Sequence, residues 1–236
     1  MKILKLLFTY PLLFTKTVYG LILRFYKVNI LRDEFTIEVV RWFKDKGDEK
    51  LRLNYKILNE HSIVFDVGGY LGDFAHDINQ KYNCTVYLFE PHPVYWEYCT
   101  ERFANNEKVI SLNYGLSNDD GEFMLSDKVD GSSFHNPNHE FNDGVKCKVK
   151  EFFSVMRSLN VKNIDLMKIN IEGGEYPLLD HISKENRFDV AINYQIQFHN
   201  FIKNALVMRN DINDALSKTH KQTWCYPFVW ENCEKI

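Results

Sequence analysis

The sequence of 236 residues has little net charge, few cysteines and no motif that pairs them. Its formal charge is −3, which gives no electrostatic reason to expect a nucleic-acid partner. The five cysteines are odd in number, and none belongs to a C-x-x-C motif. Reduced thiols in a cytosolic protein therefore fit the sequence better than a disulfide framework or a zinc site.

The first 32 residues contain no aspartate or glutamate, although they contain six lysines and arginines. Their apolar runs, 6–14 and 18–23, fall short of the roughly 18 uninterrupted residues that a spanning helix needs. A basic start followed by apolar residues also suits a signal peptide for export, but no clear small-x-small cleavage site follows. We expect one or two basic, amphipathic helices that either pack on the main domain or dock on an anionic membrane face or a partner. The predicted domains are a helical extension over 1–60 and a main domain over 61–236.

The segment 62–73, with the sequence SIVFDVGGYLGD, is the most informative part of the main domain. Its apolar, β-branched start predicts a buried strand that carries Asp66 near its end. Gly68, Gly69 and Gly72 follow, and then a helical pattern begins. An open α/β sheet presents a nucleotide site through such a strand, glycine turn and helix, because glycine lets the backbone turn sharply and approach a ligand. An ordinary strand-to-helix turn is the alternative.

Strands and helices alternate after this turn, which predicts an α/β fold with a mostly parallel sheet and helices on both faces. Strand character is found over 85–89, 109–112, 145–149, 164–171, 188–194 and 224–230. Helical character is found over 33–46, 73–81, 94–103, 152–159, 175–182 and 198–216. We also expect a hairpin within 115–126, turned at Asp120-Gly121, and a polar surface loop over 127–144.

Glu90 ends the next predicted strand, 22 residues after Gly68. A carboxylate at this place can accept hydrogen bonds from both hydroxyls of a ribose, so the pattern indicates a ligand that contains a nucleoside. The G-x-G-x-x-G order that is typical of NAD sites is absent, since the glycines here read G-G-x-x-G. Asp66 instead suits the cationic amino-acid end of S-adenosylmethionine, which we favour over NAD as the ligand.

Four segments, in order, resemble the motifs of the FkbM-type S-adenosylmethionine-dependent methyltransferases. Residues 64–72 (VFDVGGYLG) resemble V-x-D-V-G-A-N-x-G, and residues 89–93 (FEPHP) resemble F-E-P-x-P. Residues 113–122 (NYGLSNDDGE) resemble N-x-A-L-S…G-E, and residues 166–175 (LMKINIEGGE) are similar to L-x-K-I-D-V-E-G-A-E. The resemblance implies a Rossmann-like class I methyltransferase fold, whose mostly parallel sheet includes a reversed final hairpin strand. It also implies methyl transfer to an oxygen, often a hydroxyl of a sugar or of a small metabolite.

The resemblance also implies a set of residues around the cofactor, S-adenosyl-L-methionine. These residues are Asp66, Gly68, Gly69, Tyr70, Gly72, Glu90, Pro91, Leu116, Ser117 and Asn170. Asp66, Gly68 and Gly72 would shape the methionine end of the site, and Glu90 would hold the ribose. Leu116 and Ser117 would lie near the adenine. We expect Tyr70 to line the mouth of the pocket.

Several positions depart from the pattern of the family, among them Gly69 and Tyr70 in the place of its alanine and asparagine. Asn170 replaces the aspartate of K-I-D, and Gln197 takes the acidic place in a segment that resembles E-x-H and ends at His199. Asparagine keeps the size and the hydrogen bonding of aspartate but loses its charge. The change at Asn170 therefore indicates either a different geometry of the acceptor or an impaired enzyme.

Methyl transfer removes a proton from the acceptor oxygen, so a base is expected to assist it. Glu172 and His199 are the catalytic candidates. Each has a structural alternative: Glu172 would cap the helix that follows it, and His199 would be an ordinary surface or core histidine. Lys168 is expected to be a strand residue that reaches solvent, and contact with the substrate is the alternative. No metal is predicted, because His135 and His139 in the polar loop lack the spacing of ligands.

The predicted function is an S-adenosylmethionine-dependent O-methyltransferase acting on a glycan, such as a lipopolysaccharide, capsule or other lipid-linked saccharide, or on a small metabolite. The location is predicted as cytoplasmic, where this methyl donor is made, and peripheral to the inner membrane face through residues 1–32. One alternative is a non-catalytic binding or scaffold protein on a decayed methyltransferase fold. Another is an NAD-dependent oxidoreductase or epimerase. No nucleic-acid partner is predicted, and the oligomeric state stays open.

Overall fold

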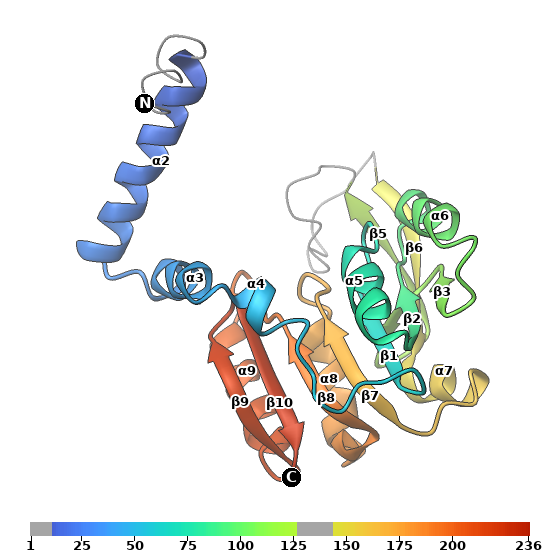
Figure 1. Cartoon of the computed structure of the whole chain (residues 1–236). Helices are drawn as coiled ribbons and strands as arrows, with labels where there is room; N and C mark the ends of the chain where they lie inside the picture. The colour runs from blue at the N-terminus through green and yellow to red at the C-terminus, as the bar shows by residue number, and fades with distance from the viewer. Residues whose placement is uncertain (1–10, 127–143) are drawn as a thin grey trace.

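The structure of the protein, a computed structural model, describes residues 11–126 and 144–236. A seven-stranded sheet in the order β3-β2-β1-β7-β8-β10-β9 forms its centre (Figure 1). The strands are β1 (Ile63–Val67), β2 (Thr85–Phe89), β3 (Val109–Leu112), β7 (Ile164–Ile169), β8 (Ala191–Ile196), β9 (His220–Tyr226) and β10 (Trp230–Lys235). The pairs are parallel except that β10 runs antiparallel to both β8 and β9. The predicted α/β fold, with its mostly parallel sheet and reversed hairpin strand, is confirmed.

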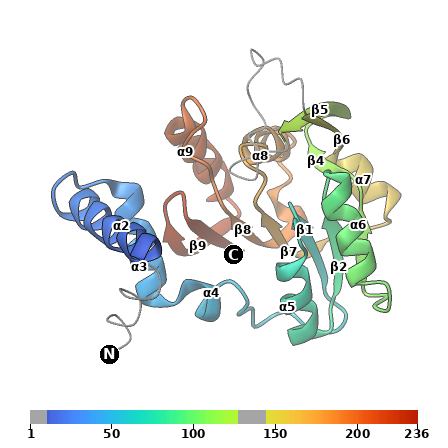
Figure 2. The same ribbon diagram turned by 90° about the horizontal axis from the view of Figure 1, so that it is seen from above.

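Helices cover both faces of this sheet. Figure 2 shows α5 on one side of the sheet and α8 and α9 on the other. The helices of the main domain are α5 (Asp73–Tyr82), α6 (Pro93–Arg102), α7 (Phe152–Ser158), α8 (Glu175–Lys184) and α9 (Ala205–Leu216). Pro93 stands at the start of α6, where its missing N–H costs no helical hydrogen bond.

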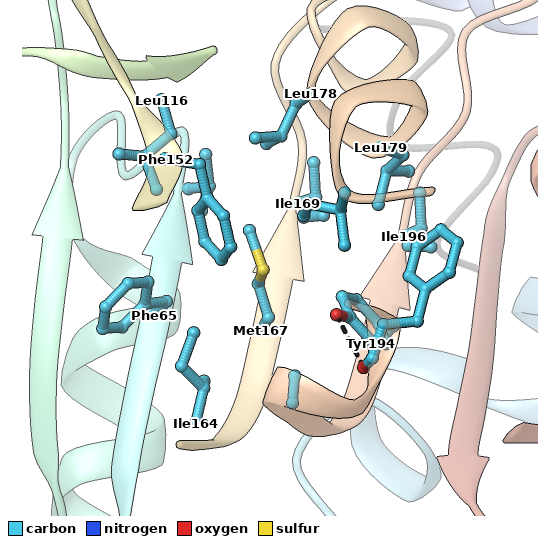
Figure 3. Packing of buried hydrophobic residues seen from close by; sticks show 14 of the residues in the cluster. Phe65, Leu116, Phe152, Ile164, Met167, Ile169, Leu178, Leu179, Tyr194 and Ile196 are labelled. Carbon is cyan, nitrogen blue, oxygen red and sulfur yellow. Dashed lines mark hydrogen bonds between the residues drawn. The ribbon is translucent and has the colours of Figure 1, made fainter. Parts of the chain in front are cut away.

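Alternating side chains of the strands supply one hydrophobic cluster on each face. In β1, Val64 packs on the side of α5, whereas Phe65 packs in the larger cluster on the opposite side. Phe65 is in register with Met167 of β7, and Figure 3 shows both beneath the side chains of α8. Burial on both faces holds the carboxyl ends of β1 and β7 in a fixed relation, which matters for the site below.

A small second sheet differs from the prediction for 115–126. Its strands are β4 (Gly115–Ser117), β5 (Gly121–Ser126) and β6 (Gly144–Glu151), in the order β4-β6-β5. The hairpin is wrong, because β6 lies between β4 and β5 and pairs with both. The Asp120 carboxylate accepts the Glu151 N–H at 2.8 Å and so ties the link between β4 and β5 to the end of β6. The strand predicted over 145–149 is confirmed, and the loop prediction for 127–144 falls almost wholly outside the described residues.

Two predictions near the C-terminus are also corrected. The helix expected over 198–216 begins only at Ala205, because side chains of α8 bind the backbone N–H and C=O of His199. The single strand expected over 224–230 is two strands joined by a turn at Pro227 and Phe228. Phe228 has a left-handed backbone with φ of 61°, and the Val229 N–H bonds the carbonyl of Tyr226 at 2.8 Å.

The N-terminal extension consists of α2 (Pro11–Asn29), α3 (Glu34–Asp45) and the single turn α4 (Gly47–Lys50). Asp33 caps α3 by accepting the Thr36 N–H at 2.9 Å, as expected of a residue at this place. Trp42 of α3 is buried against Tyr226 and Trp230 of the β9–β10 hairpin. In the part of the chain that the structure describes, none of the helices is long and apolar enough to cross a membrane. The division into domains at residue 60 stays a prediction.

Candidate active site

The candidate site lies where the strand order of the large sheet reverses, between β1 and β7. β1 pairs with β2 on one side and with β7 on the other. In an open α/β sheet, a crevice forms at the carboxyl ends of the strands at such a reversal, and ligands bind there. Two turns meet at this place, one over 68–72 after β1 and one over 170–174 after β7.

The glycine turn is pressed against the ends of both neighbouring strands. The N–H groups of Gly68 and Gly69 donate to the carbonyl of Phe89 at 3.0 and 3.2 Å. A Cβ atom at Gly68, whose φ is +84°, would stand 2.0 Å from the carbonyl oxygen of Asn170. A Cβ atom at Gly69 would stand 2.4 Å from the side chain of Leu88. Only glycine fits these two positions without moving β2 or β7.

A buried ion pair lies beneath the glycine turn. The Lys168 ammonium donates to the carboxylate of Asp66 and to the carbonyl of Gly68, each at 2.7 Å. Lys168 is 4% exposed and Asp66 is fully buried, so the prediction that Lys168 reaches solvent is wrong. The physical reason is the register, which places Lys168 beside Asp66 on the same face of the sheet. Asp66 Oδ2 and Asn170 Oδ1 are buried and have no hydrogen-bond partner among the described residues.

Glu90 lies on the other side of the glycine turn and binds its backbone. Its carboxylate accepts the backbone N–H of Tyr70 at 2.7 Å and that of His92 at 2.9 Å. Burial raises the pKa of Glu90 to about 7, against the opposing effect of these two hydrogen bonds. Tyr70 has a left-handed backbone, with φ of 49°, and its half-exposed ring packs edge-on against Tyr95. A strained residue that the surrounding contacts hold in place is typical of a functional turn.

The other predicted cofactor residues lie further out. Gly72 precedes α5 with φ of +78°, where a Cβ atom would meet the ring of Phe103 at 2.7 Å. Pro91 is buried beside Gly115 of β4. Leu116 is buried in the large core cluster, and the Ser117 hydroxyl donates to the side chain of Asn118 at 3.0 Å. The placement of Leu116 and Ser117 near an adenine stays a prediction.

The two catalytic candidates, Glu172 in the second turn and His199 after β8, lie side by side. His199 Nε2 is 3.4 Å from a carboxylate oxygen of Glu172, and His199 Nδ1 is 3.0 Å from Glu175. Glu175 is fully buried and also accepts the backbone N–H of Gly173 and that of His199, both at 2.8 Å. Glu172 keeps 38% of its side chain exposed and has a left-handed backbone, with φ of 51°. Gly174 stands at the N-cap of α8 without a side-chain hydrogen bond, so Glu172 pairs with His199 and does not cap this helix.

The two carboxylates set the charge of His199. Burial alone would lower the pKa of the imidazole, but the hydrogen bonds and charges of Glu172 and Glu175 outweigh it and raise the pKa to about 9. At neutral pH, His199 is therefore a cation held between two carboxylates. An exposed carboxylate next to a fixed imidazolium is an arrangement that can accept a proton from a bound hydroxyl.

The Glu175→Gln variant is expected to lower the pKa of His199, because the change removes one of the two negative charges that stabilise the imidazolium. The pKa of the ring can be followed by NMR titration of the histidine signals, with the His199 signal assigned from its absence in His199→Gln. Glu185→Gln, at an exposed residue at the opposite end of the same helix, is the matched control and should leave that pKa near 9. An unchanged value in Glu175→Gln would contradict the arrangement described above.

Sequence reasoning missed Glu175 and misjudged Lys168. Glu175 is the last residue of the segment LMKINIEGGE, so the motif contained it without indicating its partner. The pairing of Lys168 with Asp66 depends on the register of β1 and β7 across 102 residues of chain. His135 and His139, at which no metal site was predicted, lie outside the described residues.

The order of the large sheet, its reversed strand and the glycine turn at the strand reversal define a Rossmann-like class I methyltransferase fold. The model of the family described as the methyltransferase FkbM domain matches residues 66–220, which is more than half of the chain. The protein therefore belongs to the FkbM methyltransferase family, and this family and fold make it a methyltransferase. No curated protein matches the chain.

Several solved structures are similar to this chain at low sequence identity. An rRNA methylase from Streptococcus thermophilus is 12% identical, with a TM-score of 0.47 over 77% of this chain and 90% of that one. Fibrillarin from Aeropyrum pernix, solved with natively bound S-adenosyl-L-methionine, is 9% identical, with a TM-score of 0.45 over 78% and 70%. The N-methyltransferase NodS from Bradyrhizobium japonicum is 8% identical, with a TM-score of 0.43 over 83% and 97%. At such values, these likenesses carry no argument about the acceptor of the methyl group.

Proposed function

We propose that the protein is an S-adenosylmethionine-dependent O-methyltransferase whose acceptor is a hydroxyl of a glycan or of a small metabolite. The observation that carries the proposal is the half-exposed carboxylate of Glu172, held by His199 beside the glycine turn. A hydroxyl needs a base in its reach to lose its proton, and Glu172 offers one at the carboxyl edge of β7. An amine acceptor would have less need of such a group, which favours oxygen over nitrogen.

The residues around the glycine turn fit S-adenosylmethionine. Asp66 Oδ2 and Asn170 Oδ1 are acceptors without a partner among the described residues, and the ammonium of the methionine end is a donor that suits them. Each oxygen of the Glu90 carboxylate accepts one backbone N–H and keeps a lone pair for a ribose hydroxyl. When bound, S-adenosylmethionine would supply a methyl group on a positively charged sulfur.

In the mechanism that we propose, Glu172 accepts the proton of the acceptor hydroxyl. The bound cofactor would supply the methyl carbon to the hydroxyl oxygen, and its sulfur would leave with the electron pair of the broken bond. His199, as the imidazolium, orients Glu172 and does not itself take the proton. Glu175 positions His199 from the buried side. Most of the acceleration would come from holding the two reacting groups in line.

The affinity for S-adenosylmethionine is expected to rise with pH through about 7. The ribose hydroxyls donate to the ionised form of Glu90, so the cofactor binds the protein that has lost this proton. With a pKa of about 7, the ionised fraction, and with it the affinity, rises about tenfold between pH 6 and pH 8. Isothermal titration calorimetry at several pH values measures this directly.

The matched variants are Glu90→Gln and Glu97→Gln, since Glu97 is an exposed residue of the neighbouring helix α6. The first should bind the cofactor more weakly and lose the pH dependence, whereas the second should behave as the wild type does. If the affinity of the wild type for S-adenosylmethionine did not change between pH 6 and pH 8, Glu90 would not bind the ribose. An unchanged affinity of Glu90→Gln for the cofactor would lead to the same conclusion.

A further inference from the structure

The helix α2 carries an apolar surface that the rest of the described chain leaves uncovered. Eight large apolar side chains between residues 19 and 31 are 39 to 66% exposed. They are Tyr19, Leu21, Ile22, Leu23, Phe25, Tyr26, Ile30 and Leu31. Such a cluster, with six residues in α2 and two directly after it, exceeds the single apolar residues that a soluble surface commonly shows, and it indicates a surface that binds something.

The polar side of the same helix is basic. Arg24 and Lys27 are exposed and lie three residues apart, so they share one face of α2. Ile22 and Tyr26 are spaced by four residues and lie on the opposite side, and Leu21 and Phe25 flank them. Arg32 follows the helix, and no acidic residue occurs in the first 32 residues of the sequence. α2 is therefore amphipathic, with a broad apolar side and a narrow cationic side.

The position of α2 leaves this surface accessible. α3 is anchored to the sheet through Trp42, whereas α2 meets α3 only at its C-terminal end and extends away from the sheet (Figure 1). In Figure 1 it rises on the side to which the carboxyl ends of β1 and β7 point, which is the edge that bears the candidate site. A surface bound by α2 would therefore face the active-site edge.

We propose that α2 docks the protein on an anionic lipid bilayer, lying in the interface with its apolar side in the acyl boundary and Arg24, Lys27 and Arg32 at the headgroups. A helix with a large apolar side, cations and no acidic residue has the composition of such interfacial helices. A second copy of the chain fits less well, because the like charges of two α2 helices would be brought together. Docking would hold the candidate site near acceptors that are themselves bound to lipid.

Flotation of the full-length protein with vesicles tests this proposal. Vesicles of equal parts phosphatidylcholine and phosphatidylglycerol should carry the wild type, and vesicles of phosphatidylcholine alone should not. Arg24→Gln with Lys27→Gln should weaken binding by about 30-fold, at about 1 kcal/mol for each cation near an anionic surface. Ile22→Ser with Phe25→Ser should weaken it by at least about 100-fold, from the loss of two buried apolar side chains.

Matched pairs on the main domain serve as controls. Lys218→Gln with Lys221→Gln removes two exposed cations, and Leu206→Ser with Val207→Ser removes two exposed apolar side chains. Both pairs should float as the wild type does, and all variants should keep the affinity for S-adenosylmethionine. Equal binding to neutral vesicles, no binding to either kind, or a stable dimer in solution that α2 variants dissociate would each overturn the proposal. The result does not depend on the reaction catalysed, so it can fail independently of the proposed function.

Discussion

Replacing Glu172 by glutamine is expected to lower kcat by about 10²–10⁴-fold, the range in which general bases contribute. Glutamine keeps the size of the side chain but cannot take the proton of an acceptor hydroxyl. The reaction is followed by formation of S-adenosylhomocysteine with a hydroxyl acceptor that the wild type methylates. The affinity for S-adenosylmethionine should hardly change, because Glu172 pairs with His199 and is not among the residues that we propose hold the cofactor.

The control for this loss is Glu185→Gln, which removes a carboxylate from the exposed end of α8 and should keep the full rate. His199→Gln should lower kcat as well, since His199 holds Glu172 in place. Full activity in Glu172→Gln would show that another group, or water, accepts the proton. It would leave the ion pair of Glu172 and His199 with a structural role only.

Replacing Lys168 by methionine is expected to destabilise the protein by about 3–5 kcal/mol, the cost of leaving a buried charge without its partner. Asp66 would remain fully buried, and the carbonyl of Gly68 would lose a donor at 2.7 Å. Urea unfolding measures the change as a lower midpoint with an unchanged slope. The effect is large because the side chains of Lys168 and Asp66 are buried, so water cannot replace the lost ion pair.

Two further variants separate this effect from other causes. Lys146→Met removes a surface cation whose pair with Glu122 is about half exposed, and it should change the stability by less than about 1 kcal/mol. Asp66→Asn combined with Lys168→Met should recover much of the loss, because no unpaired charge remains. A loss in Lys168→Met no greater than that in Lys146→Met would contradict the buried pair.

Local patterns in the sequence were sufficient for β1, β2, β3 and β7, for the glycine turn and for the family. The run from Ile63 to Val67 is apolar apart from Asp66 and is buried on both faces of the sheet, and the following Gly68 is required by a close contact with Asn170. Such features depend on neighbours in the chain or on a backbone shape that only glycine allows. For the same reason, the positions of Asp66 and Glu90 at the ends of β1 and β2 could be predicted.

Features that depend on distant residues could not be predicted in this way. The pair of Lys168 with Asp66 requires the register of two strands, and the contact of Glu175 with His199 requires the path of the chain after β8. That contact also prevents a helix from starting at 198, although the residues favour one. The position of β6 between β4 and β5 also depends on distant residues. The local turn at Asp120-Gly121 predicts two adjacent strands and gives no sign of a third strand between them.

The central claim is that the glycine turn after β1 binds S-adenosylmethionine and not a dinucleotide. Isothermal titration calorimetry of the wild-type protein at pH 8, with S-adenosylmethionine and with NAD in turn, tests it most directly. The account predicts saturable binding of one S-adenosylmethionine for each chain and no measurable binding of NAD. Absence of binding at millimolar S-adenosylmethionine, or binding of NAD instead, would contradict it.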